Sequence, residues 1–268
     1  MSEIVCLKQS GEELGDKESP IKNTCVEQSA TRLKIVAEGL ANMNIAGLLV
    51  VSGGGNFMRG RSFPKETTGP TLASKADAIA RWGTAMNTFA LGAALSDLGV
   101  PHQIFMAPNM QLMDPTLSFP SFDLDAVDEA YRDDKVVLMA GGYGQDGCST
   151  DLAVAKYTIR QAQTGRYRHV ASYKSTDVPG VYDRNPKQYD DARFISDLSA
   201  GEGLEMGIQV VDEQSLIALR DYHPEDGMPD VGLRVYSSQH SLLEVIHSER
   251  IGAPLGSLIL SGSARVFA

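Results

Sequence analysis

The sequence predicts an α/β protein, a three-layer αβα sandwich built around a mostly parallel β-sheet. Short apolar runs of strand length alternate along the 268 residues with longer segments of helical period, which is the pattern of successive βαβ units. The short runs are apolar throughout rather than at every second position, as is typical of strands that helices cover on both faces. We therefore expect one sheet with helices on each side of it.

Seven runs have the length and composition of strands. In chain order they are Ile4–Lys8, Ala46–Ser52, His102–Met106, Lys135–Ala140, His169–Lys174, Gly232–Tyr236 and Ser257–Leu260. Six longer segments between them have helical period. They are Asn23–Met43, Lys75–Leu98, Leu124–Arg132, Asp151–Gln163, Glu213–Arg220 and Ser241–His247. In the first of these helices, apolar residues recur every three or four positions from Val26 to Leu40, so one of its faces should be buried.

Two polar loops interrupt this pattern, Phe63–Thr71 and Tyr182–Ala192, and both are rich in turn-forming and charged residues. Loops at the carboxyl edge of such a sheet commonly bind ligands. Both are therefore candidate lids, although the second could equally be a solvated connection.

Composition and charge exclude several classes of protein. The formal net charge of −10 argues against general nucleic-acid binding. Cys6, Cys25 and Cys148 are widely spaced, which favours a reducing compartment over a disulfide framework or a zinc knuckle. Charged residues such as Glu3 and Lys8 interrupt any signal-peptide core, and no apolar run is long enough for a membrane span. We expect a cytoplasmic protein that binds neither membrane nor nucleic acid.

Glycine-rich loops follow three of the predicted strands, at Lys8–Gly11, Gly53–Gly55 and Gly141–Gly147. Because glycine adopts positive φ and has no Cβ, successive backbone amides in such loops can point at one anion. A single loop of this kind often makes only a turn. Three of them at the carboxyl ends of strands are expected to meet at one crevice and to bind phosphate groups.

Two basic residues accompany these loops. Lys8 ends the first predicted strand beside Ser10 and Gly11, where an ammonium group could neutralise phosphoryl oxygens. Arg59 follows the run of three glycines, and its guanidinium could hold a phosphate or carboxylate through two parallel hydrogen bonds. Each residue alone could be a solvated surface cation, but beside the glycines both favour a phosphate site.

Two aspartates lie near predicted helix starts. Asp151 follows Ser149 and Thr150, so its carboxylate could stabilise the helix dipole, or could orient lysines in a phosphoryl transfer. Asp77 follows the predicted start of the helix Lys75–Leu98, and an N-cap is its simplest role.

Other chemistries have little support. Gly142–Gly147 spells GxGxxG, but it follows the fourth predicted strand and no acidic residue occurs between Asp151 and Asp177, which disfavours a Rossmann dehydrogenase. The sequence contains no GxxxxGK[ST], HExxH or GxSxG. A P-loop kinase, a zinc hydrolase and a serine hydrolase are therefore not indicated.

Several segments together resemble the amino-acid kinase superfamily, most closely the bacterial uridylate (UMP) kinases. They are LKQSGEEL at Leu7–Leu14, VVSGGGNFMRG at Val50–Gly60, DAIARWGTAMNTFALGAAL at Asp77–Leu95, STDLAVA at Ser149–Ala155 and STDVPGVYDRNP at Ser175–Pro186. With GAPLGSLI near the C-terminus, they occur in the family's order over nearly the whole chain. The resemblance implies one domain over residues 1–268, with an acceptor-binding half at about 1–165 and an ATP-binding half at about 166–268.

The resemblance also implies an activity, the transfer of the γ-phosphate of ATP to UMP with Mg²⁺, in a homo-oligomer that is usually a hexamer among bacterial UMP kinases. Lys8, Arg59 and Asp151 would be catalytic, with Lys8 stabilising the transferring phosphoryl group. The positions implied to bind ATP are Lys8, Ser10, Gly11, Gly55, Thr176, Tyr182 and Asn185. Those implied to bind the acceptor are Gly54, Arg59, Asp77, Tyr143, Gly144, Ser149 and Thr150. No side chain is implied as a metal ligand.

The acceptor loop departs from the family pattern. Where the family reads close to GTGNPFFTTD, this chain has GGYGQDGCSTD, so Asp146, Gly147 and Cys148 replace a proline and two phenylalanines. Asn185 also replaces the usual aspartate of the ADP segment, and the TDV of Thr176–Val178 is closer to aspartate and acetylglutamate kinases. Two alternatives therefore stay open: a kinase of another small acidic or phosphorylated acceptor, and a nucleotide-binding storage protein resembling molybdenum storage subunits.

Overall fold

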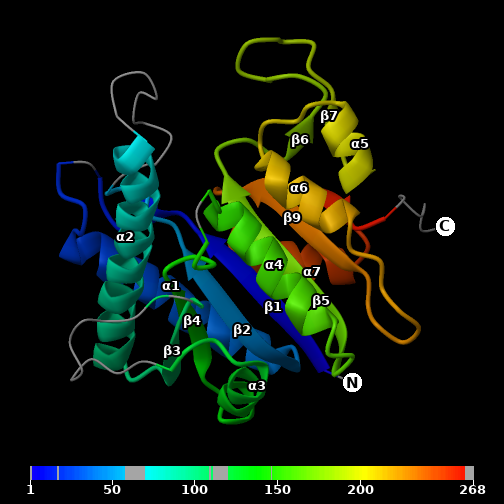
Figure 1. Cartoon of the computed structure of the whole chain (residues 1–268). Helices are drawn as coiled ribbons and strands as arrows, with labels where there is room; N and C mark the ends of the chain where they lie inside the picture. The colour runs from blue at the N-terminus through cyan, green and yellow to red at the C-terminus, as the bar shows by residue number, and fades with distance from the viewer. Residues whose placement is uncertain are drawn as a thin grey trace. The chain divides into compact units, whose positions relative to one another are not determined.

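The computed structural model of the chain describes residues 2–16, 18–57, 70–108, 110, 120–145 and 147–262. Eight strands form a mostly parallel sheet in the order β3-β4-β2-β1-β5-β9-β10-β8, and β6 pairs with β7 (Figure 1). The strands are β1 Ser2–Gln9, β2 Ile45–Ser52, β3 His102–Met106, β4 Val136–Ala140, β5 Tyr167–Thr176, β6 Val181–Tyr182, β7 Phe194–Ile195, β8 Asp197–Ser199, β9 Val231–Ser237 and β10 Ser257–Leu260. The helices are η1 Gly11–Glu13, α1 Asn23–Asn42, α2 Pro70–Asp97, α3 Leu124–Arg132, α4 Thr150–Ala162, α5 Ala200–Glu205, α6 Glu213–Arg220 and α7 Leu242–Arg250.

The predicted α/β class is confirmed, and all seven predicted strands and six predicted helices are present. The largest difference in bounds is at α2, which begins at Pro70 rather than Lys75. Proline suits the first helical position because the N–H that it lacks would have no partner there. The predicted loop Phe63–Thr71 is therefore wrong at its end, and its residues 63–69 lie outside the described part of the chain.

Five short elements are absent from the sequence-based prediction: η1, β6, β7, β8 and α5. They have two to six residues each, too few to show a hydrophobic period. For α5, the sequence does hold a start signal. Ser199 and Glu202 form a capping box, in which each side chain accepts a hydrogen bond from the backbone N–H of the other.

The longest helix in the described part of the chain is α2, with 28 residues. Neither α2 nor any other described helix is long and apolar enough to cross a membrane.

The chain forms two compact units. Unit 1 comprises residues 1–7, 43–45 and 151–268, and unit 2 comprises residues 8–42 and 46–150. The expected single domain, with halves that divide near residue 165, stays a prediction. The units themselves join at Leu7–Lys8, at residues 42–46 and at Thr150–Asp151.

In unit 2, β4 lies between β3 and β2 and is parallel to both, with Leu138 opposite Ile104 on one side and Val50 on the other. Leu138 is fully buried. Helix α2 packs on β3 and β4, while α3 packs on β4. A Cβ at Gly47 would lie 2.4 Å from the ring of Tyr131, so glycine at this position allows α3 to approach β2 closely.

In unit 1, β5 is parallel to β9, whereas β10 is antiparallel to β9 and parallel to β8. Helices α4 and α7 cover opposite faces of β1. Gln161 of α4 donates to the Cys6 Sγ at 3.1 Å, and Arg250 of α7 donates to Glu3 at 2.9 Å. Because successive side chains of a strand alternate between faces, positions 3 and 6 point to opposite sides of the sheet.

Candidate functional site

Two buried asparagines in unit 2 hold the loop of three glycines that follows β2. The Nδ2 of Asn87 in α2 donates to the Gly53 carbonyl at 2.6 Å. Asn87 and Asn56 also exchange side-chain hydrogen bonds of 2.9 and 2.7 Å, and both residues are at most 1% exposed. Buried amides with satisfied partners fix a loop in one conformation. Neither residue is among the predicted site residues, although a polar Asn87 within an apolar helical stripe is a usable signal.

The first glycine loop packs directly on the second. The Gly53 N–H donates to the Gln9 carbonyl at 2.9 Å. A Cβ at Gly11 would lie 2.4 Å from Asn56 Oδ1 and 2.6 Å from the Gly53 carbonyl oxygen, so only glycine fits there. Ser10 caps η1 and accepts from the N–H of Glu12. Lys8 lies half-buried near the end of β1.

The third loop, Gly141–Gly147, follows β4 and leads into α4. Four of its glycines have positive φ, which side chains rarely adopt; they are Gly141, Gly142, Gly144 and Gly147. A Cβ at Gly144 would lie 1.8 Å from the Pro108 carbonyl oxygen. A Cβ at Gly53 would lie 3.5 Å from Thr150 Oγ1, so the end of this loop reaches the second loop. Within unit 2, the structure thus brings all three predicted loops together.

Asp77 is not an N-cap, and that interpretation is wrong because α2 begins seven residues earlier, at Pro70. The half-buried Asp77 instead accepts a hydrogen bond of 2.9 Å from the Gly147 N–H. This bond ties α2 to the third glycine loop. Gly147 belongs to the stretch in which the sequence departs from the family pattern.

The other predicted acceptor-side residues are also in unit 2. Gly54 and Gly55 lie in the second loop, Tyr143 and Gly144 lie in the third, and Ser149 and Thr150 lie where α4 begins. The amides at a helix N-terminus favour negative charge. Arg59 and Asp146 are outside the described residues.

In unit 1, Asp151 forms an ion pair with Lys174 of β5. The side chains are 12% and 13% exposed, so solvent screens this pair less than a surface pair. The Lys174 Nζ also donates to the Val210 carbonyl at 2.7 Å, and the Asp212 N–H donates to Asp151 at 3.4 Å. Asp151 therefore orients a lysine in this structure, and its part in a phosphoryl transfer stays a prediction. Lys174 is not among the predicted site residues, although it ends a buried strand run much as Lys8 does.

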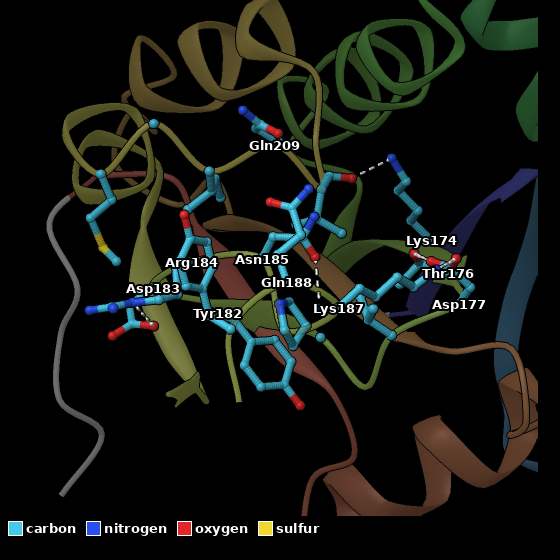
Figure 2. A pocket seen from close by; sticks show the side chains of 18 residues that line it. Lys174, Thr176, Asp177, Tyr182, Asp183, Arg184, Asn185, Lys187, Gln188 and Gln209 are labelled. Atoms are coloured by element: carbon cyan, nitrogen blue, oxygen red, sulfur yellow. Dashed lines mark hydrogen bonds and ion pairs between the residues drawn. The ribbon is translucent and has the colours of Figure 1, made fainter. Parts of the chain in front are cut away.

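A pocket of about 540 Å³ in unit 1 begins beside Lys174 (Figure 2). Thr176, Tyr182 and Asn185, all predicted as ATP-binding, line this pocket together. Figure 2 shows Lys174, Thr176 and Asp177 on one side of it and Asp183 and Arg184 on the other. The volume is in the range typical of small-molecule sites. We call it the donor pocket.

The predicted loop Tyr182–Ala192 forms one wall of the donor pocket between β6 and β7. Asn185 Oδ1 accepts from the Lys187 N–H at 3.0 Å, so Asn185 shapes the turn of this loop. Lys187 also forms an ion pair with Asp177 on the opposite wall. The Lys187 ammonium holds the pKa of the Asp177 carboxyl below its usual value. Both side chains are exposed, so this ion pair holds the loop over the pocket only weakly.

Comparisons with known proteins agree with this arrangement. The sequence matches the model of the amino acid kinase family over residues 5–224. The uridylate kinase of Campylobacter jejuni is 27% identical over 246 residues, which is 91% of this chain and 93% of that protein. The uridylate kinase of Malacoplasma penetrans is 28% identical over 213 residues, which is 78% of this chain and 60% of that protein.

Among solved structures, the UMP kinase from Bacillus anthracis has a similar fold, with a TM-score of 0.74 at 22% identity. The match covers 96% of this chain and 95% of that one. The family model extends from β1 past the end of α6 and so spans more than half of the sequence. This chain belongs to the amino acid kinase family.

Proposed function

We propose that this protein is an ATP-dependent phosphotransferase that moves the γ-phosphate of ATP to the phosphate of UMP, giving UDP and ADP. One observation carries the proposal, the start of α4. Thr150 lies beside Gly53 of the second glycine loop, and the next residue, Asp151, holds the Lys174 ammonium in place. Phosphoryl transfer depends mainly on positioning and on neutralising phosphate charge. Backbone amides and a fixed ammonium supply both.

ATP would enter the donor pocket, where Thr176, Tyr182 and Asn185 line the walls. Lys174 at one side of this pocket is oriented by Asp151 and would neutralise negative charge on the phosphates. Because the ammonium is already fixed by Asp151 and by the Val210 carbonyl, little reorganisation is needed when the nucleotide binds.

UMP would bind to the glycine loops of unit 2. The amides of Gly54 and Gly55 and those at the start of α4 would receive its phosphate. Lys8 and Arg59 would add the positive charge that the family resemblance assigns to them. The curated uridylate kinases of similar length support UMP as the acceptor.

The reaction needs no general base on the enzyme. A phosphate monoester has a second pKa of about 6, so the attacking oxygen of UMP is largely anionic at neutral pH. This fits the carboxylate of Asp151, which is already committed to Lys174. Mg²⁺ would be bound mainly through the phosphates of ATP and water, as is usual in kinases, and would neutralise phosphate charge.

The test is a direct assay of nucleotide products. The purified protein is incubated with Mg-ATP and UMP, and the nucleotides are separated by chromatography. UDP formation that exceeds the formation of CDP or GDP from CMP or GMP is the expected result. ADP formation only with another acceptor would reject UMP while keeping the kinase. Binding of ATP without turnover for any acceptor would leave a storage or binding role.

One observation favours the second candidate, a kinase of another small phosphorylated or acidic acceptor. The resemblance assigns Asp77 to the acceptor nucleoside, yet this carboxylate accepts the Gly147 amide of the altered loop. An acceptor without a nucleoside would leave that hydrogen bond intact. The panel of acceptors should therefore include small phosphorylated metabolites and acidic amino acids beside the nucleotides.

Assembly and compartment remain predictions. We expect a homo-oligomer in the cytoplasm, with a hexamer as the family's usual form. Light scattering during size-exclusion chromatography would measure the mass of the particle directly.

A further inference from the structure

A second cavity, of about 1070 Å³, lies in unit 1 and shares no lining residue with the donor pocket. Its walls come from β1, β5, β9, β10 and α7. On β5, the residues Arg168–Tyr173 border this cavity in part, whereas the donor pocket begins at Lys174. The two cavities therefore lie along one strand, the second toward its amino end.

A buried arginine faces this second cavity. The side chain of Arg234 is 6% exposed, and its Nε donates to Glu249 at 2.6 Å. Its Nη1 makes a long contact of 3.4 Å with the Gly256 carbonyl. The other Glu249 oxygen accepts from the Tyr173 hydroxyl at 2.8 Å, so that carboxylate is satisfied by these two residues.

The guanidinium of Arg234 has five N–H donors in a rigid plane. The contacts above use its Nε and Nη1, and within the described residues Nη2 has no protein acceptor. Nη2 is not among the fully buried atoms that lack a partner, so solvent in the cavity reaches it. The remaining N–H groups of Arg234 suit a carboxylate or phosphate oxygen that enters the cavity, since such oxygens match the guanidinium fork.

The cavity lining carries three arginines and four carboxylates, so the preference for an anion comes from the orientation of the Arg234 donors and not from net charge. Arg168 and Arg250 share one carboxylate, Glu3, and Glu249 balances the charge of Arg234. Asp197 and Asp230 also line the cavity, but both are exposed. Water and salt screen exposed charges, whereas the buried Arg234 acts at a lower local dielectric.

Apolar side chains complete the cavity. Leu258 and Leu260 of β10 and Ile246 of α7 line it beside the arginine. A cavity with apolar walls and a few oriented polar groups is typical of a site for a small organic molecule. We propose that this cavity binds a small organic anion, with one carboxylate or phosphate on Arg234 and an apolar body against these three residues, and that this ligand acts on the donor pocket through β5.

The strand β5 provides the link. Tyr173 and Lys174 are consecutive, so their side chains point to opposite faces of the sheet. Tyr173 contacts Glu249 at the second cavity, and Lys174 contacts Asp151 at the donor pocket. An anion that draws Arg234 away from Glu249 would change the support of Tyr173, and thereby the position of the neighbouring ammonium.

Binding is tested with phenylacetate, phenyl phosphate and the uncharged benzyl alcohol, by calorimetry on the full chain. The donor pocket is filled beforehand with a non-hydrolysable ATP analogue. We expect saturable binding of at least one of the two anions and none of the alcohol; the stronger anion identifies the preferred head group. An anion affinity that falls without limit as the analogue concentration rises would mean direct competition at the donor pocket and would overturn the proposal, since an allosteric effect levels off at saturation; no anion binding at all would overturn it as well.

The paired variant Arg234→Met with Glu249→Gln removes the guanidinium without leaving a single buried charge, and the amide still accepts from Tyr173. We expect it to weaken anion binding at least about tenfold, since a charge-assisted pair is lost. Arg220→Met with Asp221→Asn makes the same charge changes at an exposed ion pair that lines neither cavity, and should leave binding unchanged. Equal binding by both variants would contradict the assignment to Arg234.

The coupling is measured as the affinity for the ATP analogue with and without the anion. Allosteric effects are commonly about 5-fold to 150-fold, so a change of at least about fivefold in either direction is expected. An unchanged affinity while the anion is bound would refute the link through β5. Because this readout is nucleotide binding rather than turnover, it does not depend on UMP being the acceptor.

Discussion

Replacing Asn87 with leucine should destabilise the protein by about 2–6 kcal/mol. The change conserves approximate volume but removes the donor to the Gly53 carbonyl at 2.6 Å and the donor to Asn56 Oδ1 at 2.7 Å. Both acceptors are buried, and each buried acceptor left without a partner costs about 1–3 kcal/mol. The Asn56 amide keeps one bond, to the Pro20 carbonyl, and adds little to the total.

The free energy of unfolding is measured by urea denaturation followed by circular dichroism. Wild type and variant are compared with the same value of m, the dependence of that free energy on urea concentration. Asn42→Leu is the matched control, because Asn42 is exposed at the end of α1 and should change stability by less than about 0.5 kcal/mol. A loss of under about 1 kcal/mol for Asn87→Leu would refute the view that these amides hold the glycine loop.

Three further outcomes follow from the site and the core. Asp151→Asn should lower kcat about 100-fold with a smaller effect on KM, because Lys174 loses the charge that orients it; steady-state kinetics measure this. Gly144→Ala should cost more than about 2 kcal/mol in urea unfolding, because its Cβ would lie 1.8 Å from the Pro108 carbonyl oxygen at a φ of +77°. Burial raises the pKa of the Cys6 thiol to about 11, so iodoacetamide at pH 8 should spare Cys6 in the folded protein, as peptide mass spectrometry would show.

Each of these predictions has an internal control. Glu213→Gln changes an acidic residue in the first turn of another helix and should leave kcat unchanged. Gly207→Ala has a φ of +63° but open space around its Cβ, so it should cost less than the substitution at Gly144. Cys25 and Cys148 are partly exposed and should be alkylated under the same conditions. Equal effects of paired variants, or labelling of Cys6 at the rate of Cys25, would contradict the reasoning.

Most of the fold could be predicted from the sequence because its long elements carry strong periodic patterns. The bounds of α3, α6, β3 and β10 agree with the prediction residue for residue. The short β6, β7 and β8 could not be predicted, since two or three residues pair only because partners distant in the sequence bring them to an edge. The start of α2 shows a local signal, Pro70, that the pattern of apolar residues obscured.

The candidate site could likewise be predicted only in part. Glycines at strand ends are visible in the sequence, and they indicated the three loops that the structure brings together in unit 2. Contacts between residues that are far apart in the sequence cannot be recognised from it. Lys174 is 23 residues from Asp151, and Asn87 is 31 residues from Asn56, so no local pattern links them. The contact of Asp77 with Gly147 could not be predicted for the same reason, because the two residues are 70 positions apart.

The tight contact of Gly11 with Gly53 and Asn56 determines where this protein is able to change in evolution. A single methyl group at Gly11 would collide with both neighbours, so the first two loops must vary together or not at all. By contrast, no atom of the described residues lies within 4 Å of a Cβ added at Gly142 or Gly147.

Their positive φ is still restrictive, but Asn44 and Asp134 adopt φ values of 57° and 54° in this same chain. Asparagine and aspartate are the side chains that tolerate this conformation best. Substitution of Gly142 and Gly147 by Asn or Asp is thus a short evolutionary route by which the protein could exchange one acceptor for another. The first and second glycine loops would stay unchanged during that exchange.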